Sequence, residues 1–354
     1  MPVRTGKRTV TSFFEFWPGW LFYIPTVTAW LLMGARYRGF SLPTAANPHV
    51  EAGGLCGERK ASILDQAGPL ARAAIAPYCT MTTGADDLAL ALRRIAEAGL
   101  ALPLVVKPNI GCNGNGVRLV RDEAALAAAL AAFSRGVELV IQRLVEDEHE
   151  AGLFYVRMPD EPRGRLTSLT LKRAPFVTGD GVSTLKELVM ADPRYGSVPD
   201  IYLPRLHDRL DEVLPPGERF RLVFAGNHCK GSVFENGTAL VTPALEARVD
   251  AILRDLPDFH FGRVDVKFDS LARLRDGDGF TVIEINGVGS EATHIWDPST
   301  TLRDAYLDQF RHYRDAFLIG RAMRKKGFRP TRPFELLGYW MHQRRLMRSY
   351  PLND

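Results

Sequence analysis

Two segments in the second half of the chain have the residue alternation of β-strands and carry charged and amide side chains. They are residues 261–269 (Phe-Gly-Arg-Val-Asp-Val-Lys-Phe-Asp) and 280–286 (Phe-Thr-Val-Ile-Glu-Ile-Asn). Between them, Arg-Asp-Gly-Asp-Gly at 275–279 predicts a hairpin turn. Because side chains alternate between the faces of a strand, the polar members of each segment share one face. They are Arg263, Asp265 and Lys267 in the first segment and Glu284 and Asn286 in the second.

This arrangement suits a hard metal ion. Magnesium takes oxygen ligands, usually only one or two of them carboxylates, and phosphate oxygens often complete its shell. Asp265, Glu284 and Asn286 are therefore candidate metal ligands. The alternative is a solvated hairpin face without a ligand.

A glycine-rich loop lies upstream, between two further strand-like segments. The apolar run 104–107 ends in Lys107, and residues 117–120 form the second segment. Glycine and asparagine adopt the left-handed conformations that let backbone N–H groups approach an anion, and a lysine is a common point-charge partner for phosphate. The loop therefore indicates a phosphate flap, with a plain hairpin as the alternative. Its candidate phosphate-binding residues are Gly111, Asn113, Gly114, Asn115 and Gly116.

Taken in order, these motifs resemble the ATP-grasp ligases, in particular the branch of D-alanine–D-alanine ligase, glutathione synthetase and cyanophycin synthetase. The resemblance covers roughly residues 57–320. It implies that Lys60 and Lys107 are the two phosphate lysines. It also implies that Gln142 and Val145, on the strand 138–145, hold the adenine.

The resemblance implies further roles at single positions. Glu150 would bind the ribose. Arg263 and Lys107 would act in catalysis, Arg263 by stabilising an oxyanion and Lys107 by neutralising phosphate charge. Residues 171–188 and 191–196 are similar to the cyanophycin synthetase and fused glutathione synthetase pattern. The candidate substrate-binding residues are Lys172, Arg173, His228, Lys230, Glu291 and His294.

The fold that the resemblance implies is α+β, with ATP held between the antiparallel sheets of two lobes. A full N-terminal Rossmann-like domain, which the D-alanine ligases have, is not expected, because only about 55 residues precede Lys60. After Asn286 the chain reads Gly-Val-Gly-Ser-Glu where those ligases have a Ser-Pro-Gly segment. D-Alanine is therefore doubtful as the acceptor.

Composition agrees with a globular enzyme of two or more subdomains. The 354 residues are 46% hydrophobic and 24% charged. The four cysteines form no CxxC pair, so neither a disulfide framework nor a zinc site is indicated, and a reducing cytoplasm is expected. The predicted organisation is an aromatic N-terminal segment (1–55), a first lobe with the glycine flap (56–145), a second lobe with the metal site (146–320) and a basic tail (321–354).

The two ends of the chain carry weak membrane signals. Residues 16–35 hold no charge, but two prolines and several polar residues interrupt them, so a span, interfacial docking and burial against the protein or a dimer partner all stay open. Between residues 321 and 348, nine Lys/Arg face a single acid, and apolar residues interleave with them. This basic amphipathic pattern predicts either contact with anionic lipid or a helix packed on the enzyme. Nucleic acid is not expected, because no recognised binding module accompanies the patch.

The sequence thus predicts an ATP-dependent carboxylate–amine ligase that releases ADP and phosphate. Its cofactors would be ATP and Mg²⁺, or Mn²⁺ in place of Mg²⁺, and its substrates a small carboxylate and an amine. The enzyme would lie in the cytoplasm or peripherally on the inner face of the membrane, and a homodimer stays open. The alternatives are an ATP-grasp kinase that stops at phosphoryl transfer and a non-catalytic, membrane-docked ATP-binding scaffold.

Overall fold

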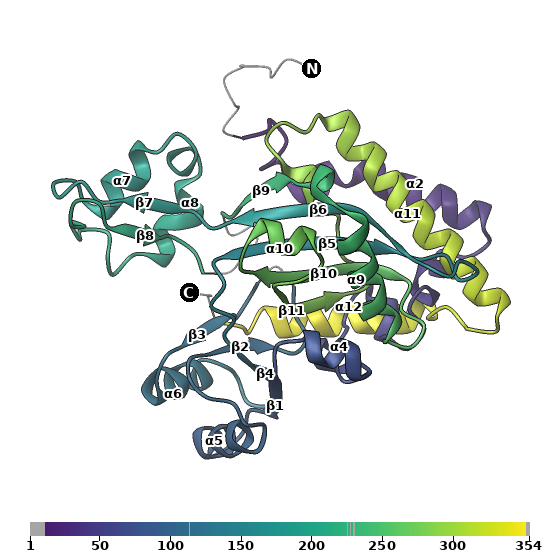
Figure 1. Cartoon of the computed structure of the whole chain (residues 1–354), viewed down its shortest axis with the longest axis horizontal. Coiled ribbons are helices and arrows are strands. Elements are labelled where there is room, and N and C mark those ends of the chain that lie inside the picture. The colour runs from purple at the N-terminus through teal and green to yellow at the C-terminus, as the bar shows by residue number, and fades with distance from the viewer. Residues whose placement is uncertain (1–10, 113, 225, 227, 229–230, 352–354) are drawn as a thin grey trace.

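The computed structural model describes residues 11–112, 114–224, 226, 228 and 231–351. The strands form sheets of four, five and two strands, and all pairs within these sheets are antiparallel. Helices pack on both larger sheets, so the predicted α+β class is confirmed (Figure 1).

The four-stranded sheet forms a lobe of its own, drawn at the bottom of Figure 1. Its helices cover one face, where apolar side chains such as Met81, Leu104 and Leu126 form the core. In α6, Asp122 caps the N-terminus by accepting a hydrogen bond from the backbone N–H of Ala125. In spatial order the strands are β1 (Tyr78–Thr82), β4 (Glu138–Arg143), β2 (Leu104–Pro108) and β3 (Arg118–Val120), and the helices are α5 (Asp87–Glu97) and α6 (Glu123–Ala131).

The five-stranded sheet is the centre of the molecule. Its spatial order is β11 (Phe280–Asn286), β10 (Phe261–Phe268), β5 (His149–Val156), β6 (Arg165–Arg173) and β9 (Val233–Asn236). The helices that pack on one face include α3 (Lys60–Leu64), α4 (Pro69–Ala74) and α9 (Pro243–Arg254).

The other face of this sheet has two parts along the strands: an apolar part that packs against a helix and a polar part that lines a cavity. Alternation on β5 directs Phe154 and Val156 into an apolar cluster with α11 (Leu302–Lys325). On the same face Glu150 points into a polar cavity, and Gly152 leaves room there, since a Cβ would lie 3.1 Å from the Asp265 Oδ1 atom. One face therefore holds both packing and site residues.

The connection between β10 and β11 differs from the predicted hairpin turn. It contains a short helix, α10 (Leu271–Arg275), whose N-terminus is capped by the Ser270 hydroxyl. The turn then closes through Gly277 and Gly279, which have positive φ. The Gly-rich sequence was correctly assigned to the turn, but the helix before it lengthens the connection.

A small unit projects between β6 and β9, at the left of Figure 1. It has its own apolar cluster, and Thr184 and Glu187 form a capping box at the start of α7. Its elements are β7 (Phe176–Thr178), α7 (Leu185–Ala191), α8 (Pro199–Tyr202) and β8 (Arg219–Arg221), with 3₁₀ helices at Tyr195–Ser197 and Leu203–Arg205.

The terminal segments pack on this body. Helix α2 (Ile24–Arg36), preceded by α1 (Gly19–Phe22), lies along α11, with Trp30 against Tyr313 and Phe317. Helix α12 (Pro333–Met347) lies behind β11 in Figure 1, and its Gln343 side chain accepts a hydrogen bond from the Gly57 N–H at 2.8 Å. The remaining 3₁₀ helices are Leu42–Ala45, Glu51–Gly54, Thr238–Leu240 and Thr293–Trp296.

Two observations bear on the predicted domain boundaries. Helices α3 and α4, which the prediction assigns to the first lobe, share the core of the five-stranded sheet. Helix α11 continues to Lys325, past the predicted end of the second lobe at residue 320. In the described part of the chain, no helix combines the length and apolarity that crossing a membrane requires.

Candidate active site

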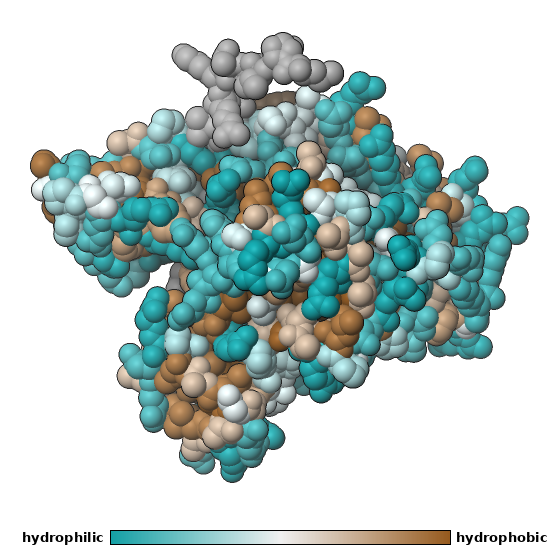
Figure 2. All heavy atoms as spheres, viewed as in Figure 1, coloured by the Kyte–Doolittle hydropathy of each residue, from teal (hydrophilic) through white to brown (hydrophobic). Residues whose placement is uncertain are grey.

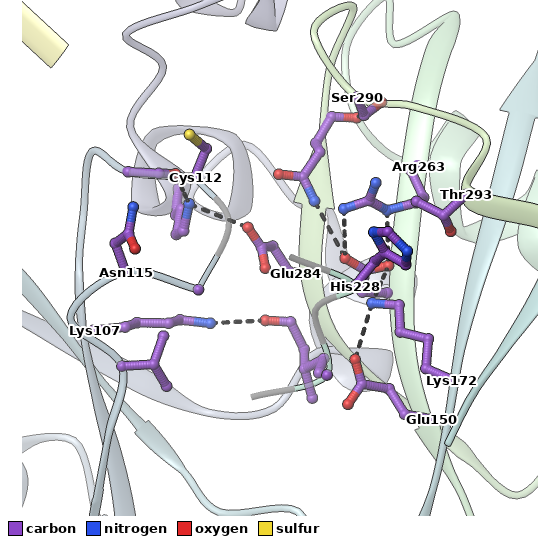
Figure 3. Close-up of a pocket in the computed structure, with 18 of the residues that line it drawn as sticks. Lys107, Cys112, Asn115, Glu150, Lys172, His228, Arg263, Glu284, Ser290 and Thr293 are labelled. Atoms are coloured by element: carbon purple, nitrogen blue, oxygen red, sulfur yellow. Dashed lines mark hydrogen bonds and ion pairs between the residues drawn. The ribbon is translucent and has the colours of Figure 1, made fainter. Parts of the chain in front are cut away.

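A cavity of about 530 Å³ lies between the two larger sheets. Strand β2 and the loop after it form one wall, and strands β10, β11 and β6 form the other (Figure 3). The molecular surface is indented where the small β7–β8 unit meets the four-stranded lobe (Figure 2). The cavity brings together most of the residues that the sequence singles out, as follows.

Lys107 is the penultimate residue of strand β2, and its ammonium lies inside the cavity. It donates hydrogen bonds to the Gln142 Oε1 atom at 2.8 Å and to the Ile283 carbonyl at 3.0 Å. Neither partner is charged, and burial lowers the pKa of Lys107 to about 8, although Glu284 nearby opposes this effect. A phosphate bound here would give the Lys107 ammonium a negatively charged hydrogen-bond partner.

Lys60 lies at the start of α3 and reaches the same space from the other side. Its ammonium binds the Gly111 carbonyl at 2.7 Å and the Glu284 Oε1 atom at 3.1 Å. Burial alone would lower its pKa, but Glu284 and Glu58 outweigh burial and raise it. Lys60 therefore links the glycine loop to strand β11.

Asp265 is the most deeply buried acid of the cavity and is held by two cations. The Arg263 guanidinium donates two hydrogen bonds to it, at 2.9 and 3.1 Å, and the Lys172 ammonium lies 2.9 Å from its Oδ1 atom. Burial alone would raise the pKa of Asp265, but Arg263 and Lys172 outweigh burial and lower it to about 2. The carboxylate therefore stays ionised at neutral pH.

The register of β10 and β11 brings the three candidate metal ligands to one place. Asp265 pairs with Glu284, a bulge follows Asp265, and the Asn286 amide lies 3.5 Å from the Asp265 Oδ2 atom. Two carboxylates and one amide form a donor set that suits Mg²⁺, which needs few protein ligands when phosphate is present. Among the described residues, no group of three or more His, Cys, Asp and Glu side chains is placed so that it could hold a metal ion.

The residues assigned to adenine and ribose also line the cavity. Gln142 is buried on β4 and donates to the Ala76 carbonyl at 3.1 Å, and Val145 follows the end of that strand. Glu150 is buried on β5 and accepts from the Lys172 ammonium at 2.9 Å. A ribose bound here would therefore contact a carboxylate that already forms an ion pair.

Of the predicted glycine loop, Gly111, Gly114 and Asn115 line the cavity. Gly116 does not; it has positive φ and packs against Pro108 and Phe133. Asn113 lies outside the described residues.

Only some of the predicted substrate-binding residues line the cavity. Lys172, His228 and Glu291 line the cavity. Arg173 points away from it and pairs with Glu235 at 2.8 Å, and His294 pairs with Asp308 of α11 at 2.9 Å. Lys230 lies outside the described residues.

Several cavity residues carried no predicted role. Lys267 lies on the same face of β10 as Asp265, so the residue alternation of this strand already indicates that its side chain points into the cavity. Glu58 lies two residues before Lys60, and burial raises its pKa to about 7, although Lys60 opposes this effect. Gly19 and Tyr23 come from the N-terminal segment, and no local pattern indicates their place in the cavity.

The N-terminal segment is anchored beside the cavity by a buried acid. The Glu15 carboxylate contacts the Arg194 guanidinium and lies 3.0 Å from the His228 Nε2 atom. Burial would raise the pKa of Glu15, but His228 and Arg194 outweigh burial and lower it. Phe16 stacks on the His228 ring with a centroid distance of 5.7 Å, so residues near position 15 shape the cavity wall.

Comparison with known proteins gives structural likenesses only. No protein-family model matches the sequence, and no curated protein matches it either. Among solved structures, D-alanine–D-alanine ligase from Bacillus anthracis shares 16% identity at a TM-score of 0.43, and covers 78% of this chain and 71% of its own. The VanG D-Ala:D-Ser ligase from Enterococcus faecalis shares 14% identity at a TM-score of 0.39, over 72% of this chain and 63% of its own.

A third likeness is to a bifunctional glutathione synthetase from Pasteurella multocida, with 18% identity and a TM-score of 0.35. It covers 71% of this chain, whereas this chain spans only 36% of that protein.

Proposed function

We propose that the protein is an ATP-dependent ligase of the ATP-grasp type, which activates a carboxylate as an acyl phosphate and joins it to an amine. The observation that carries this proposal is the charge arrangement of the cavity. Basic side chains from both walls surround Asp265 and Glu284, and a glycine loop lies opposite these acids. Phosphoryl transfer needs this combination of cations and metal-binding acids, because its catalysis consists mainly of positioning and charge neutralisation.

In this proposal, the phosphates of ATP lie between Lys60, Lys107 and the loop at Gly111–Asn115. Asp265, Glu284 and Asn286 hold Mg²⁺, which supplies charge neutralisation for the transferred phosphoryl group. The substrate carboxylate attacks the γ-phosphorus, and ADP leaves. The amine then attacks the acyl carbon, phosphate leaves, and the Arg263 guanidinium is oriented by Asp265 to stabilise the oxyanion.

The test is an assay of phosphate release with ATP, Mg²⁺ and a panel of amino acids and small peptides. The proposal expects ADP and phosphate only when a carboxylate and an amine are both present. ADP formation with a single substrate and no amine would favour a kinase. AMP and pyrophosphate as products would overturn the ligase, and ATP binding without any turnover would favour a scaffold.

We also propose that the protein docks on an anionic lipid surface through α2. One side of this helix, together with α1 before it, exposes an uncharged row, in which Trp20 of α1 and Ile24, Val27 and Leu31 of α2 are each more than half exposed. Its other side packs on α11, so the helix lies along the body of the protein. Aromatic and aliphatic side chains beside basic ones are typical of helices that lie in a membrane interface. The basic residues at the end of the row are Arg36, Arg38, Arg321 and Arg324.

Sedimentation with vesicles tests this docking. Binding to phosphatidylcholine vesicles that contain phosphatidylglycerol is expected, together with loss of binding in high salt and in Val27→Glu/Leu31→Glu. Equal binding to neutral vesicles would show that the negative charge of the lipid does not contribute to docking. A concentration-dependent dimer in gel filtration without vesicle binding would assign the row to a homodimer.

A further inference from the structure

We propose that Glu291 and the aromatic rings around it form the binding site for a positively charged amino group of the acceptor substrate. This inference rests on the proposed ligase function and names the chemical class of its acceptor. Glu291 lies five residues after Asn286, in the loop that leaves β11, and lines the cavity.

The Glu291 carboxylate is fixed by neutral donors. The Tyr23 hydroxyl donates to its Oε1 atom at 2.9 Å, and the Trp296 indole N–H donates to its Oε2 atom at 2.6 Å. The Gln309 amide of α11 donates to the Oε1 atom as well. Donors from three segments of the chain, one of them 268 positions away, therefore hold one acid in a fixed orientation.

None of these donors carries a charge, so the negative charge of Glu291 is not neutralised by them. Within the described residues, no Lys, Arg or His side chain forms an ion pair with this carboxylate, although most acids of the cavity have such a partner. A partly buried carboxylate without a cation favours a cationic ligand, because a ligand charge would offset the cost of its desolvation.

Aromatic rings border the space beside this carboxylate. Tyr23, Trp296 and His228 line the same cavity, and the rings of Trp296 and His228 stack with a centroid distance of 4.9 Å. Tyr23 and Trp296 reach the Glu291 carboxylate through the hydroxyl and the N–H group at the edges of their rings. A primary ammonium group beside Glu291 would therefore meet a carboxylate in a pocket with aromatic walls.

The position of this site suits an acceptor. The Arg263 guanidinium, which contacts Asp265, also donates to the Glu291 backbone carbonyl at 3.1 Å. The Arg263 guanidinium, which would stabilise the oxyanion of the reaction, therefore contacts the backbone of the residue whose carboxylate would bind the amino group. An ammonium held by Glu291 would transfer a proton to this carboxylate, and the neutral amine could then attack the acyl carbon next to Arg263.

The N-terminal segment is part of this site and does not merely cover it. Phe14, Phe22 and Trp296 pack together, with centroid distances of 4.6 Å between Phe22 and Trp296 and 6.0 Å between Phe14 and Trp296. This packing, together with the buried Glu15, holds Tyr23 against Glu291. Residues that precede the ATP-grasp motifs in sequence therefore take part in choosing the acceptor.

The competing explanation is that Glu291 only ties the three elements together. Measuring the binding of small amines distinguishes a role of Glu291 in ligand binding from a purely structural role. Butylamine, benzylamine and 1,4-diaminobutane are each compared with the alcohol of the same skeleton by saturation-transfer NMR, with and without Mg²⁺ and the β,γ-imido analogue of ATP. We expect the amines to bind at least about tenfold more tightly than the alcohols, because a charge-assisted hydrogen bond is lost with each alcohol.

Two variants complete the test. Glu291→Gln should remove the preference for amines, whereas Tyr23→Phe keeps the charge and should retain the preference while lowering the thermal midpoint. Glu97→Gln, which neutralises an exposed acid on α5, is the matched control. Equal binding of amines and alcohols by the wild-type protein would overturn the site, as would an unchanged preference in Glu291→Gln. Amine binding without ATP turnover would keep the site and overturn only the ligase.

Discussion

At the residue scale, the two acids proposed to bind magnesium differ in their partners, and this difference decides how they are tested. Asp265 is buried between Arg263 and Lys172, and removing one member of a buried ion pair typically costs about 3–5 kcal/mol of stability. Among the described residues, Glu284 forms an ion pair only with Lys60, and its side chain is 26% exposed. Glu284→Gln is therefore the cleaner substitution.

We expect Glu284→Gln to lower kcat on the order of a hundredfold or more, because a metal contact contributes several kcal/mol to the transition state. Its urea midpoint should change little, whereas Asp265→Asn should lose both activity and stability. The checks are ADP release at saturating Mg²⁺ and chemical unfolding, with Glu97→Gln as the control. If Glu284→Gln turned over near the wild-type rate, this strand face would be solvated surface only.

Lys107 gives a prediction about pH. Its pKa of about 8 in the ligand-free protein means that the ammonium loses its proton as the pH rises through 8. A neutral amine cannot neutralise phosphate, so ATP affinity should be highest below pH 8 and should fall above it, with proton uptake on binding at pH 8.5. Titration calorimetry in two buffers of different ionisation enthalpy measures both effects. Lys107→Met should bind weakly at every pH, and a wild-type affinity that stayed constant to pH 9.5 would contradict this role.

At the scale of elements, the N-terminal segment should depend on one buried ion pair. The Glu15 side chain is fully buried, and the Arg194 guanidinium that it contacts is 6% exposed. Glu15→Gln removes the negative charge that contacts this buried guanidinium, so we expect a loss of about 3–5 kcal/mol in the free energy of unfolding. Urea denaturation measures this loss. The exposed pair Arg94–Glu97 is the comparison, where Glu97→Gln should cost no more than about 1 kcal/mol.

The elements that the sequence predicted best are those whose signal is local. Alternation on β10 and β11 predicted which side chains share a face, and the glycines between β2 and β3 predicted a loop beside Lys107. The helix α10 was missed, because the glycines after it gave the stronger turn signal.

The remaining parts depend on contacts between distant segments, which no local pattern contains. Tyr23 meets Glu291 across 268 positions, and Glu15 meets His228 across 213. Likewise, the packing of α3 and α4 on the five-stranded sheet assigns them to a different core from the one that their place in the sequence suggested.

At the scale of the whole molecule, two buried histidines should make the fold sensitive to acid. Burial, assisted by His294, lowers the pKa of His312 to about 4, and burial with Arg157 lowers that of His260 to about 4. An unfolded histidine titrates near pH 6.5, so between about pH 6.5 and 4 the unfolded chain binds more protons than the folded one. Stability should therefore fall as the pH decreases through this window.

Urea midpoints from pH 7.5 to 4.5 measure this effect. The variants His312→Gln and His260→Gln should each reduce the slope of stability against pH below 6.5, even where they lower stability at pH 7. The exposed His207→Gln is the control and should leave the slope unchanged. An unchanged slope in both buried variants would assign the acid sensitivity to other groups.

The central claim is that a substrate carboxylate attacks the γ-phosphorus of ATP and that the amine then releases phosphate. Oxygen transfer tests this claim most directly. With a carboxylate from the productive pair that carries ¹⁸O in both oxygens, the released phosphate should contain one ¹⁸O atom per turnover, because the bridging oxygen of the acyl phosphate leaves with it. Phosphate without the label would mean that water attacks ATP instead, and label in AMP would mean adenylation; either result would contradict the account.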